Sequence, residues 1–176
     1  MALVRKLLKK TRLKFILRFL LIFNLLSIPL YIAIYTGLSF LPLQIFLAQI
    51  TTEILKAQDY NLVQSGQMIV VNVDDSFYTI EVSWDSTGWK SLYALFALVV
   101  AVPAINMTDK LRFLSIGLPA IFILNLIRIA TTVLVALNFG FQYFDIVHTV
   151  LWREGLILAV VLLWYFWVKG KRIIIR

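Results

Sequence analysis

The chain has 176 residues, of which 61% are hydrophobic and 15% are charged, with a mean hydropathy of +0.90 and a formal net charge of +8. So much apolar surface exceeds what one core of this size can bury, which excludes an ordinary water-soluble domain and predicts a multi-pass membrane protein. The lysines and arginines cluster beside apolar segments, so we expect membrane lipids as partners and no nucleic acid.

The chain begins with a basic segment, residues 1–14, that leads into the first apolar stretch. This stretch is too long, and its basic flank continues too far, for a cleaved signal peptide, so we expect a lasting anchor. A membrane-spanning helix needs about 20 mainly apolar residues, and four stretches come near this length. They are Phe15 to Tyr35, Gly88 to Ile105, Leu111 to Leu137 and Leu151 to Val168.

A helix with two different faces is expected over residues 39–57, and most clearly from Ser39 to Lys56. Apolar side chains gather on one side of the helical wheel and polar ones on the other. The apolar side holds Phe40, Leu43, Phe46, Leu47, Ile50 and Ile54, and the polar side holds Gln44, Thr51, Thr52, Glu53 and Lys56. This pattern favours an interfacial or re-entrant helix over a fifth span.

The basic clusters support four spans. With four spans and both termini inside, the clusters Arg5 to Arg18, Lys110 with Arg112, and Lys169 to Arg176 all lie in the cytoplasm, as the positive-inside rule requires. The predicted localisation is therefore the cell membrane, with cytoplasmic termini and polar loops on the extracytoplasmic side.

Residues 58–85 have a β pattern. Met68 to Val73 and Phe77 to Trp84 are rich in β-branched and aromatic residues, and Asp74-Asp75-Ser76 is a turn between them. Ser65-Gly66 is a second turn that adds a third, shorter strand as an option. We expect a small extracytoplasmic β-hairpin on an otherwise all-α membrane fold, in one domain over residues 1–176.

Ser86 is the first candidate site residue, in the string Ser86-Thr87-Gly88-Trp89-Lys90-Ser91. At the start of a helix, free N–H groups and the helix dipole would activate a nucleophile, and the amides of Thr87 and Gly88 would face an oxyanion. The plain alternative is an N-cap serine. Lys90 lies one helical turn later, where it would form a Ser–Lys dyad or extend to the headgroups.

Arg128 is the second candidate, because an arginine inside an apolar segment costs about 2.5–3.5 kcal/mol and needs a partner or a task. Asn125 lies three residues earlier on the same helical face, where it would orient the guanidinium. Pro119 is expected to kink this helix and open a cavity beside it. The alternatives are a structural pair, or an arginine that extends to the outer headgroups.

His148 is the third candidate, because imidazole is the one ready base near neutral pH in this chain. Asp145 precedes it by three residues and would orient the ring if this stretch is helical; Glu154 is a less local option. Otherwise His148 is a surface residue and the carboxylates interact with solvent or with Arg153. With no cysteine and one histidine, we expect no disulfide, metal or cofactor.

The string from Ser86 to Ser91, the intramembrane arginine in Asn125-Leu126-Ile127-Arg128-Ile129, and a histidine before the last span together resemble the archaeosortase/exosortase family. The resemblance covers about Val82 to Val168, and residues 86–168 would be the catalytic helices. It implies a multi-pass membrane cysteine transpeptidase. Such enzymes cleave the C-terminal sorting signal of surface proteins and transfer the new carboxyl end to a lipid or other amine acceptor.

The resemblance implies catalytic roles for three positions: Ser86 at the family's cysteine, Arg128 at its arginine and His148 at its histidine. Serine departs from the family, since its hydroxyl needs a base in the same step whereas a thiolate is accessible near neutral pH. Three explanations are open: an engineered Cys→Ser change that traps a substrate complex, a natural serine protease, or a non-catalytic relative. A function of another class, a membrane binding or assembly protein, would make Ser86 a helix cap and Arg128 a structural residue.

Overall fold

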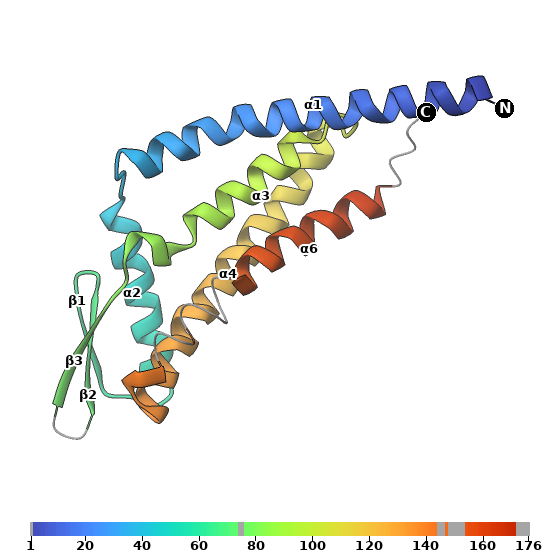
Figure 1. Cartoon of the computed structure of the whole chain (residues 1–176). Helices are drawn as coiled ribbons and strands as arrows, with labels where there is room; N and C mark the ends of the chain where they lie inside the picture. Colours follow the sequence, from blue (N-terminus) through green and yellow to red (C-terminus); the bar gives the residue numbers. More distant parts are fainter. Residues whose placement is uncertain (1, 74–75, 144–146, 148–153, 172–176) are drawn as a thin grey trace. The chain divides into compact units, whose positions relative to one another are not determined.

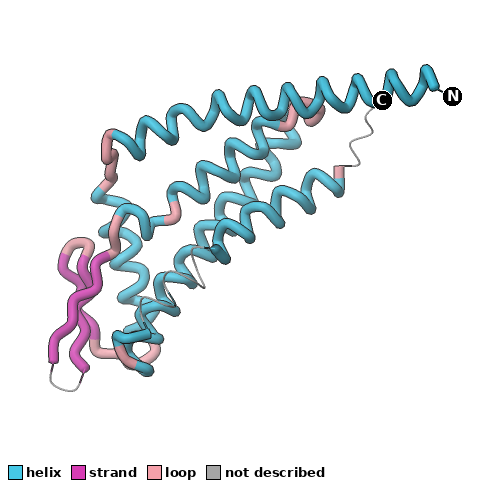
Figure 2. The backbone as a smooth tube through the Cα atoms, in the orientation of Figure 1, coloured by secondary structure: helices cyan, strands magenta, loops and turns pink. Residues whose placement is uncertain are grey.

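The computed structural model describes residues 2–73, 76–143, 147 and 154–171. These residues form long helices and one small antiparallel sheet (Figures 1 and 2). In chain order the elements are α1 (Ala2–Tyr35), α2 (Leu41–Lys56), β1 (Leu62–Ser65), β2 (Met68–Val73), β3 (Ser76–Glu81), the 3₁₀ turn η1 (Trp84–Thr87), α3 (Trp89–Ala101), α4 (Met107–Phe139), the 3₁₀ turn η2 (Phe141–Tyr143) and α6 (Glu154–Gly170).

The chain separates into two compact units, each built from several stretches of sequence. The helical unit comprises Met1–Leu38, Lys90–Pro119 and Ala159–Arg176. The sheet unit comprises Ser39–Trp89 and Ala120–Leu158. Helix α4 contributes residues to both, with the division directly after Pro119, which lies inside the helix. The expectation of a single domain over residues 1–176 stays a prediction.

Aromatic contacts and polar groups at helix ends hold the helical unit together. Phe113 stacks on Trp167 with ring centroids 4.7 Å apart. The indole of Trp164 donates a hydrogen bond to the carbonyl of Leu98. Lys110 donates to the carbonyl of Val100 at 2.7 Å, near the end of α3 where carbonyls have no helical partner.

Two described helices are long and apolar enough to cross a membrane, α1 from Arg12 and α4 over its full length. The end of the first predicted span, Tyr35, is confirmed. The predicted span Gly88 to Ile105 is too long: α3 has 13 residues and ends at Ala101, because Pro103 disfavours helical geometry at the residue before it. Helix α6 has 17 residues, so a four-span topology stays a prediction.

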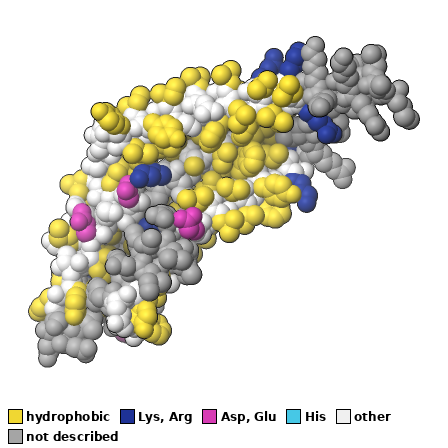
Figure 3. Space-filling model, viewed as in Figure 1, with side chains coloured by type: hydrophobic (Ala, Val, Ile, Leu, Met, Phe, Trp, Pro, Cys, Tyr) yellow, Lys and Arg dark blue, Asp and Glu magenta, His cyan; other side chains and the backbone are white. Residues whose placement is uncertain are grey.

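The helical unit exposes large apolar side chains, as a lipid-facing surface does. On α1, side chains such as Leu17, Leu21 and Leu25 are more than half exposed. Figure 3 shows hydrophobic side chains over much of the visible surface of the described chain. Patches of this kind are rare on soluble monomers and support a membrane location.

The sheet has three antiparallel strands in the order β1-β2-β3. The optional third strand is therefore confirmed as β1, and it is followed by a turn in which Gly66 has φ of +60°. The predicted strand Met68 to Val73 is confirmed with both bounds. The predicted strand Phe77 to Trp84 runs too far, because β3 ends at Glu81 and the chain then folds into η1.

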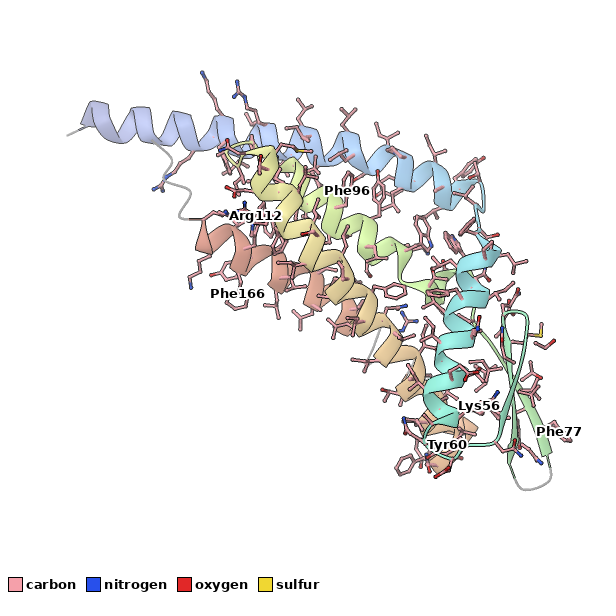
Figure 4. All side chains as sticks on the ribbon, turned by 180° about the vertical axis from the view of Figure 1, so that it is seen from behind. Lys56, Tyr60, Phe77, Phe96, Arg112 and Phe166 are labelled. Carbon is pink, nitrogen blue, oxygen red and sulfur yellow. The ribbon has the colours of Figure 1, made fainter. Side chains whose placement is uncertain are left out.

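Helix α2 packs along one face of the sheet, and Phe77 of β3 points away on the other side (Figures 1 and 4). The core of the sheet unit lies between the sheet, α2 and α4. It contains Leu47, Ala48, Leu55, Leu62, Ile69, Val71, Ile80, Val82, Ile129 and Val133.

The helix expected over residues 39–57 is confirmed as α2, but its burial is not that of a simple amphipathic helix. It buries the polar Gln44, Thr51 and Thr52 and leaves the apolar Phe46 and Ile54 exposed. Thr52 satisfies its hydroxyl within the helix by donating to the carbonyl of Ala48. The buried face of α2 thus combines these polar residues with the apolar Leu47, Ala48 and Leu55, and a place at the membrane interface stays a prediction.

Shortening a core residue of this unit is expected to lower its stability measurably. Ile69, in the middle of β2, has no exposed surface, so Ile69→Val should lower the free energy of unfolding by about 0.5–1.5 kcal/mol. Ile54 is 37% exposed, and Ile54→Val should have less than half of this effect. Denaturant unfolding in detergent micelles measures both, and equal effects would contradict the assigned core.

Candidate functional site

Ser86 lies in the 3₁₀ turn η1 and not at the start of α3, which corrects the position at a helix start that both the nucleophile and the N-cap interpretations assumed. The separation arises at Gly88, whose left-handed φ of +76° interrupts the helical path between η1 and α3. Ser86 and Lys90 therefore do not belong to one continuous helix, and the Ser–Lys dyad stays a prediction. Oxyanion binding by the amides of Thr87 and Gly88 stays a prediction.

The Ser86 side chain is buried, with 8% of its surface exposed, beside a second hydroxyl. Its Oγ atom lies 2.9 Å from Oγ of Ser83, within hydrogen-bond distance. The backbone N–H of Ser86 donates to the carbonyl of Ser83 at 3.0 Å, which closes the turn. Thr87 strengthens the same turn, because its hydroxyl donates to the carbonyl of Trp84.

Asn125 connects this turn to Arg128. Its amide nitrogen donates to the carbonyl of Ser86 at 3.1 Å, and its amide oxygen accepts a hydrogen bond from Nη1 of Arg128 at 3.3 Å. Asn125 and Arg128 are both buried, and they lie three residues apart on one face of α4. The expected pairing of these two residues is confirmed, and one amide side chain fixes both the turn and the guanidinium.

The backbone of Gly88 lies against this amide. A Cβ atom added to Gly88 would lie 2.7 Å from Cγ and 2.9 Å from Oδ1 of Asn125, which is closer than real Cβ contacts. The residue also has a positive φ, which side chains with a Cβ rarely adopt. Glycine is therefore required here for two independent reasons, its conformation and the close approach of Asn125.

A pocket of about 140 Å³ opens beside the turn. Ser86 and Arg128 both line it, so the structure brings two of the three candidate residues to one cavity. Its other lining residues come from the end of β3, the segment after it, and one face of α4. These are Ile80, Glu81, Val82, Ser83, Ile129, Thr132 and Val133. The pocket combines apolar walls with hydroxyls, one carboxylate and one guanidinium, a composition typical of a binding site for a small group.

The third candidate, His148, and its expected partner Asp145 lie outside the described residues. Glu154 begins α6 and is exposed. In the described part of the chain, no three His, Cys, Asp or Glu residues gather as metal ligands would. The expectation of no metal or cofactor stays a prediction.

Sequence reasoning missed Ser83 and Thr132. Ser83 was expected inside a strand, where its hydroxyl would have no relation to Ser86. The Thr132 hydroxyl donates to the carbonyl of Arg128 at 2.8 Å, and its position one helical turn after Arg128 was a usable signal. Nothing in the sequence indicated that β3 would end early and bring Ser83 beside Ser86.

Comparison with known protein families gives one result over nearly the whole chain. The family model described as transmembrane exosortase matches residues 2–168. No curated protein and no solved structure matches.

Proposed function

Because the chain belongs to the transmembrane exosortase family, we propose that it is built as a membrane transpeptidase that cleaves C-terminal sorting signals and transfers the new carboxyl end to a lipid or other amine acceptor. The observation that carries the proposal is one pocket lined by both Ser86 and Arg128. A nucleophile position beside a cationic hydrogen-bond donor supplies two groups that an acyl-transfer site uses, one to attack the carbonyl and one to stabilise the oxyanion.

The proposed mechanism applies to a cysteine at position 86. The thiolate attacks the carbonyl carbon of the scissile peptide bond, and Arg128 stabilises the negative oxygen that forms. The carbon–nitrogen bond then breaks, and His148 gives a proton to the leaving amine. The product of this half-reaction is a thioester between the enzyme and the new carboxyl end of the substrate.

An amine acceptor completes the cycle by attacking the thioester carbonyl. It transfers a proton to His148, forms the new amide bond and releases the thiolate. Exclusion of water from the cavity favours the amine over hydrolysis. In this proposal the protein spans the membrane four times with cytoplasmic termini, and the site faces the extracytoplasmic side.

With serine at position 86 we propose substrate binding without efficient turnover. A serine hydroxyl must lose its proton to a base as it attacks, and the described partner of the Ser86 hydroxyl is another hydroxyl, that of Ser83. This contact favours a trapped Cys→Ser form or a non-catalytic membrane binding protein over a natural serine protease. The non-catalytic alternative makes Ser86 a structural residue of the turn.

Purified protein with Ser86→Cys tests the proposal directly. The substrates are C-terminal segments, from proteins of the same source, that combine an apolar helix with a basic tail. We expect the cysteine form to cleave such a segment and to form a thioester visible by mass spectrometry, and the serine form to do neither. A cysteine form that folds, shows no adduct and cleaves no segment would refute the transpeptidase proposal.

A further inference from the structure

Among the described residues of the sheet unit, strand β3 has one side that no strand pairs with, and we call it the open side. In the strand order β1-β2-β3, β3 lies at the edge of the sheet, and its one partner among the described strands is β2. An edge strand carries a row of N–H and C=O groups that a second extended chain can pair with.

Backbone hydrogen bonds define which groups of β3 face this open side. The N–H of Val82 donates to the carbonyl of Gln67, just before β2, so the backbone of Val82 faces β2. Backbone groups alternate in direction along a strand. Ile80 therefore also faces β2, and Thr79 and Glu81 direct their N–H and C=O groups to the open side.

The pocket beside Ser86 lies at the end of this same strand. Four consecutive residues from Ile80 to Ser83 form one wall, and Ile129 and Val133 of α4 belong to another. The side chains of Ile80 and Val82 point into the core, where these two α4 residues also pack. The pocket is therefore on the core side of the β3 edge.

An added strand would lie about 4.8 Å from β3, and alternate side chains of it would point to the core side. Those side chains would be the cross-strand neighbours of Ile80 and Val82, and they would point toward Ile129 and Val133 of α4. The pocket volume of about 140 Å³ is close to that of an engineered apolar cavity, ~150 Å³, that binds benzene. The part of the pocket lined by Ile80, Val82, Ile129 and Val133 suits one aliphatic side chain of about valine or leucine size, beside the polar part that holds Ser86 and Arg128.

We propose that the open edge of β3 binds an extended segment of the substrate polypeptide as a fourth strand, and that one aliphatic side chain of this segment fills the pocket. The inference rests on the proposed function, since it places the bound segment beside position 86. It adds the recognition mode: backbone pairing along β3 holds the peptide, and the pocket selects one side chain.

The edge is tested by peptide binding to the unaltered full-length chain in nanodiscs, with no cleavage required. The probes are fluorescein-labelled hexapeptide pools with one fixed position, measured by fluorescence polarisation. Thr79→Pro removes one outward N–H and should weaken binding of the best peptide about three- to tenfold, the effect of one hydrogen bond. Pro is tolerated at an edge position of this kind.

Two matched variants separate backbone pairing from other effects. Thr79→Ala removes the side chain but keeps the N–H, and should bind within about twofold of the parent. Gln64→Pro introduces proline on the other sheet edge. The backbone of Ile69 faces β3, because Ile69 lies opposite Ile80, so the backbones of Met68 and Val70 face β1. Their partners in β1 are Ser65 and Val63, and the backbone of Gln64 between them therefore faces outward. The Gln64→Pro protein should also bind within about twofold.

Peptide variants test the same proposal without changing the protein. N-methylation of the peptide should weaken binding at alternate positions only, because alternate N–H groups face β3. At the pocket position, binding should be strongest for valine or leucine and weaker for glycine and tryptophan. Thr132→Ala enlarges the pocket and should shift this preference toward larger side chains.

Several results would overturn the inference. One is that no peptide pool binds. Another is that the Thr79→Pro and Thr79→Ala proteins bind the best peptide equally well. A third is that the β3 edge pairs two copies of the chain, while disruption of this edge leaves peptide binding unchanged. A different result would refute the proposed function and leave this inference standing. In that result, peptide binding depends on the β3 edge as described, but the Ser86→Cys protein does not cleave the bound peptide.

Discussion

Arg128→Ala in the Ser86→Cys protein is expected to lower kcat for peptide cleavage by about 10²–10³-fold. This is the usual effect of removing one donor from an oxyanion site, because charge on the carbonyl oxygen develops only in the transition state. Arg128 lines the pocket together with position 86, and Asn125 holds its guanidinium from one side. KM for the peptide should change much less than kcat if the guanidinium acts mainly in the transition state.

Two arginine variants control for folding and for charge. Arg128→Lys keeps a positive charge but loses the planar donor fork, so its activity should lie between those of the parent and the alanine variant. Arg112, near the start of the same helix, is exposed (Figure 4), and Arg112→Ala should leave activity within about twofold. An Arg128→Ala protein with parental kcat and an unchanged melting temperature would remove this residue from the mechanism.

Gly88→Ala is expected to lower the free energy of unfolding by about 2–5 kcal/mol. Left-handed backbone geometry costs a residue with a Cβ atom roughly 1–2 kcal/mol. The added methyl group also displaces the Asn125 amide, and a buried carbonyl left without its donor costs about 1–3 kcal/mol more. In the Ser86→Cys protein, cleavage should fall with the displacement of the turn.

The control is Gly66→Ala, at a glycine with φ of +60° and no atom near the position of a Cβ. It should show the conformational cost alone, about 1–2 kcal/mol. Combining Gly88→Ala with Asn125→Ala should cost less than the sum of the two single changes, because the second removes the clash. Strict additivity, measured by thermal unfolding in micelles, would contradict the contact between Gly88 and Asn125.

Much of the secondary structure was predictable because local chemistry determines it. Val70, Val71 and Val73 favour β geometry, and Ser65-Gly66 provides a turn, so β2 and the existence of β1 follow from the sequence. The pairing of Asn125 with Arg128 follows from helical spacing alone.

The geometry of the nucleophile turn was not predictable, because long-range contacts determine it. A glycine before a helical pattern does not show whether its φ is positive, and here the amide of Asn125 occupies the space of a Cβ at Gly88. Without that information, Ser86 is placed at the start of α3 instead of in η1. The burial of Gln44 and Thr51 in α2 was missed for a related reason, since helical periodicity identifies an apolar face but does not show which face packs inward.

The hydrogen bond from Asn125 to the carbonyl of Ser86 spans 39 residues of sequence, and this distance affects biosynthesis. A ribosome adds about 5–20 residues per second, so the support for the turn is made roughly 2–8 s after the turn itself. Until α4 has been synthesised, the newly made turn lacks both Asn125 and Arg128. The site is therefore completed only after the first apolar helix and the sheet strands have been synthesised.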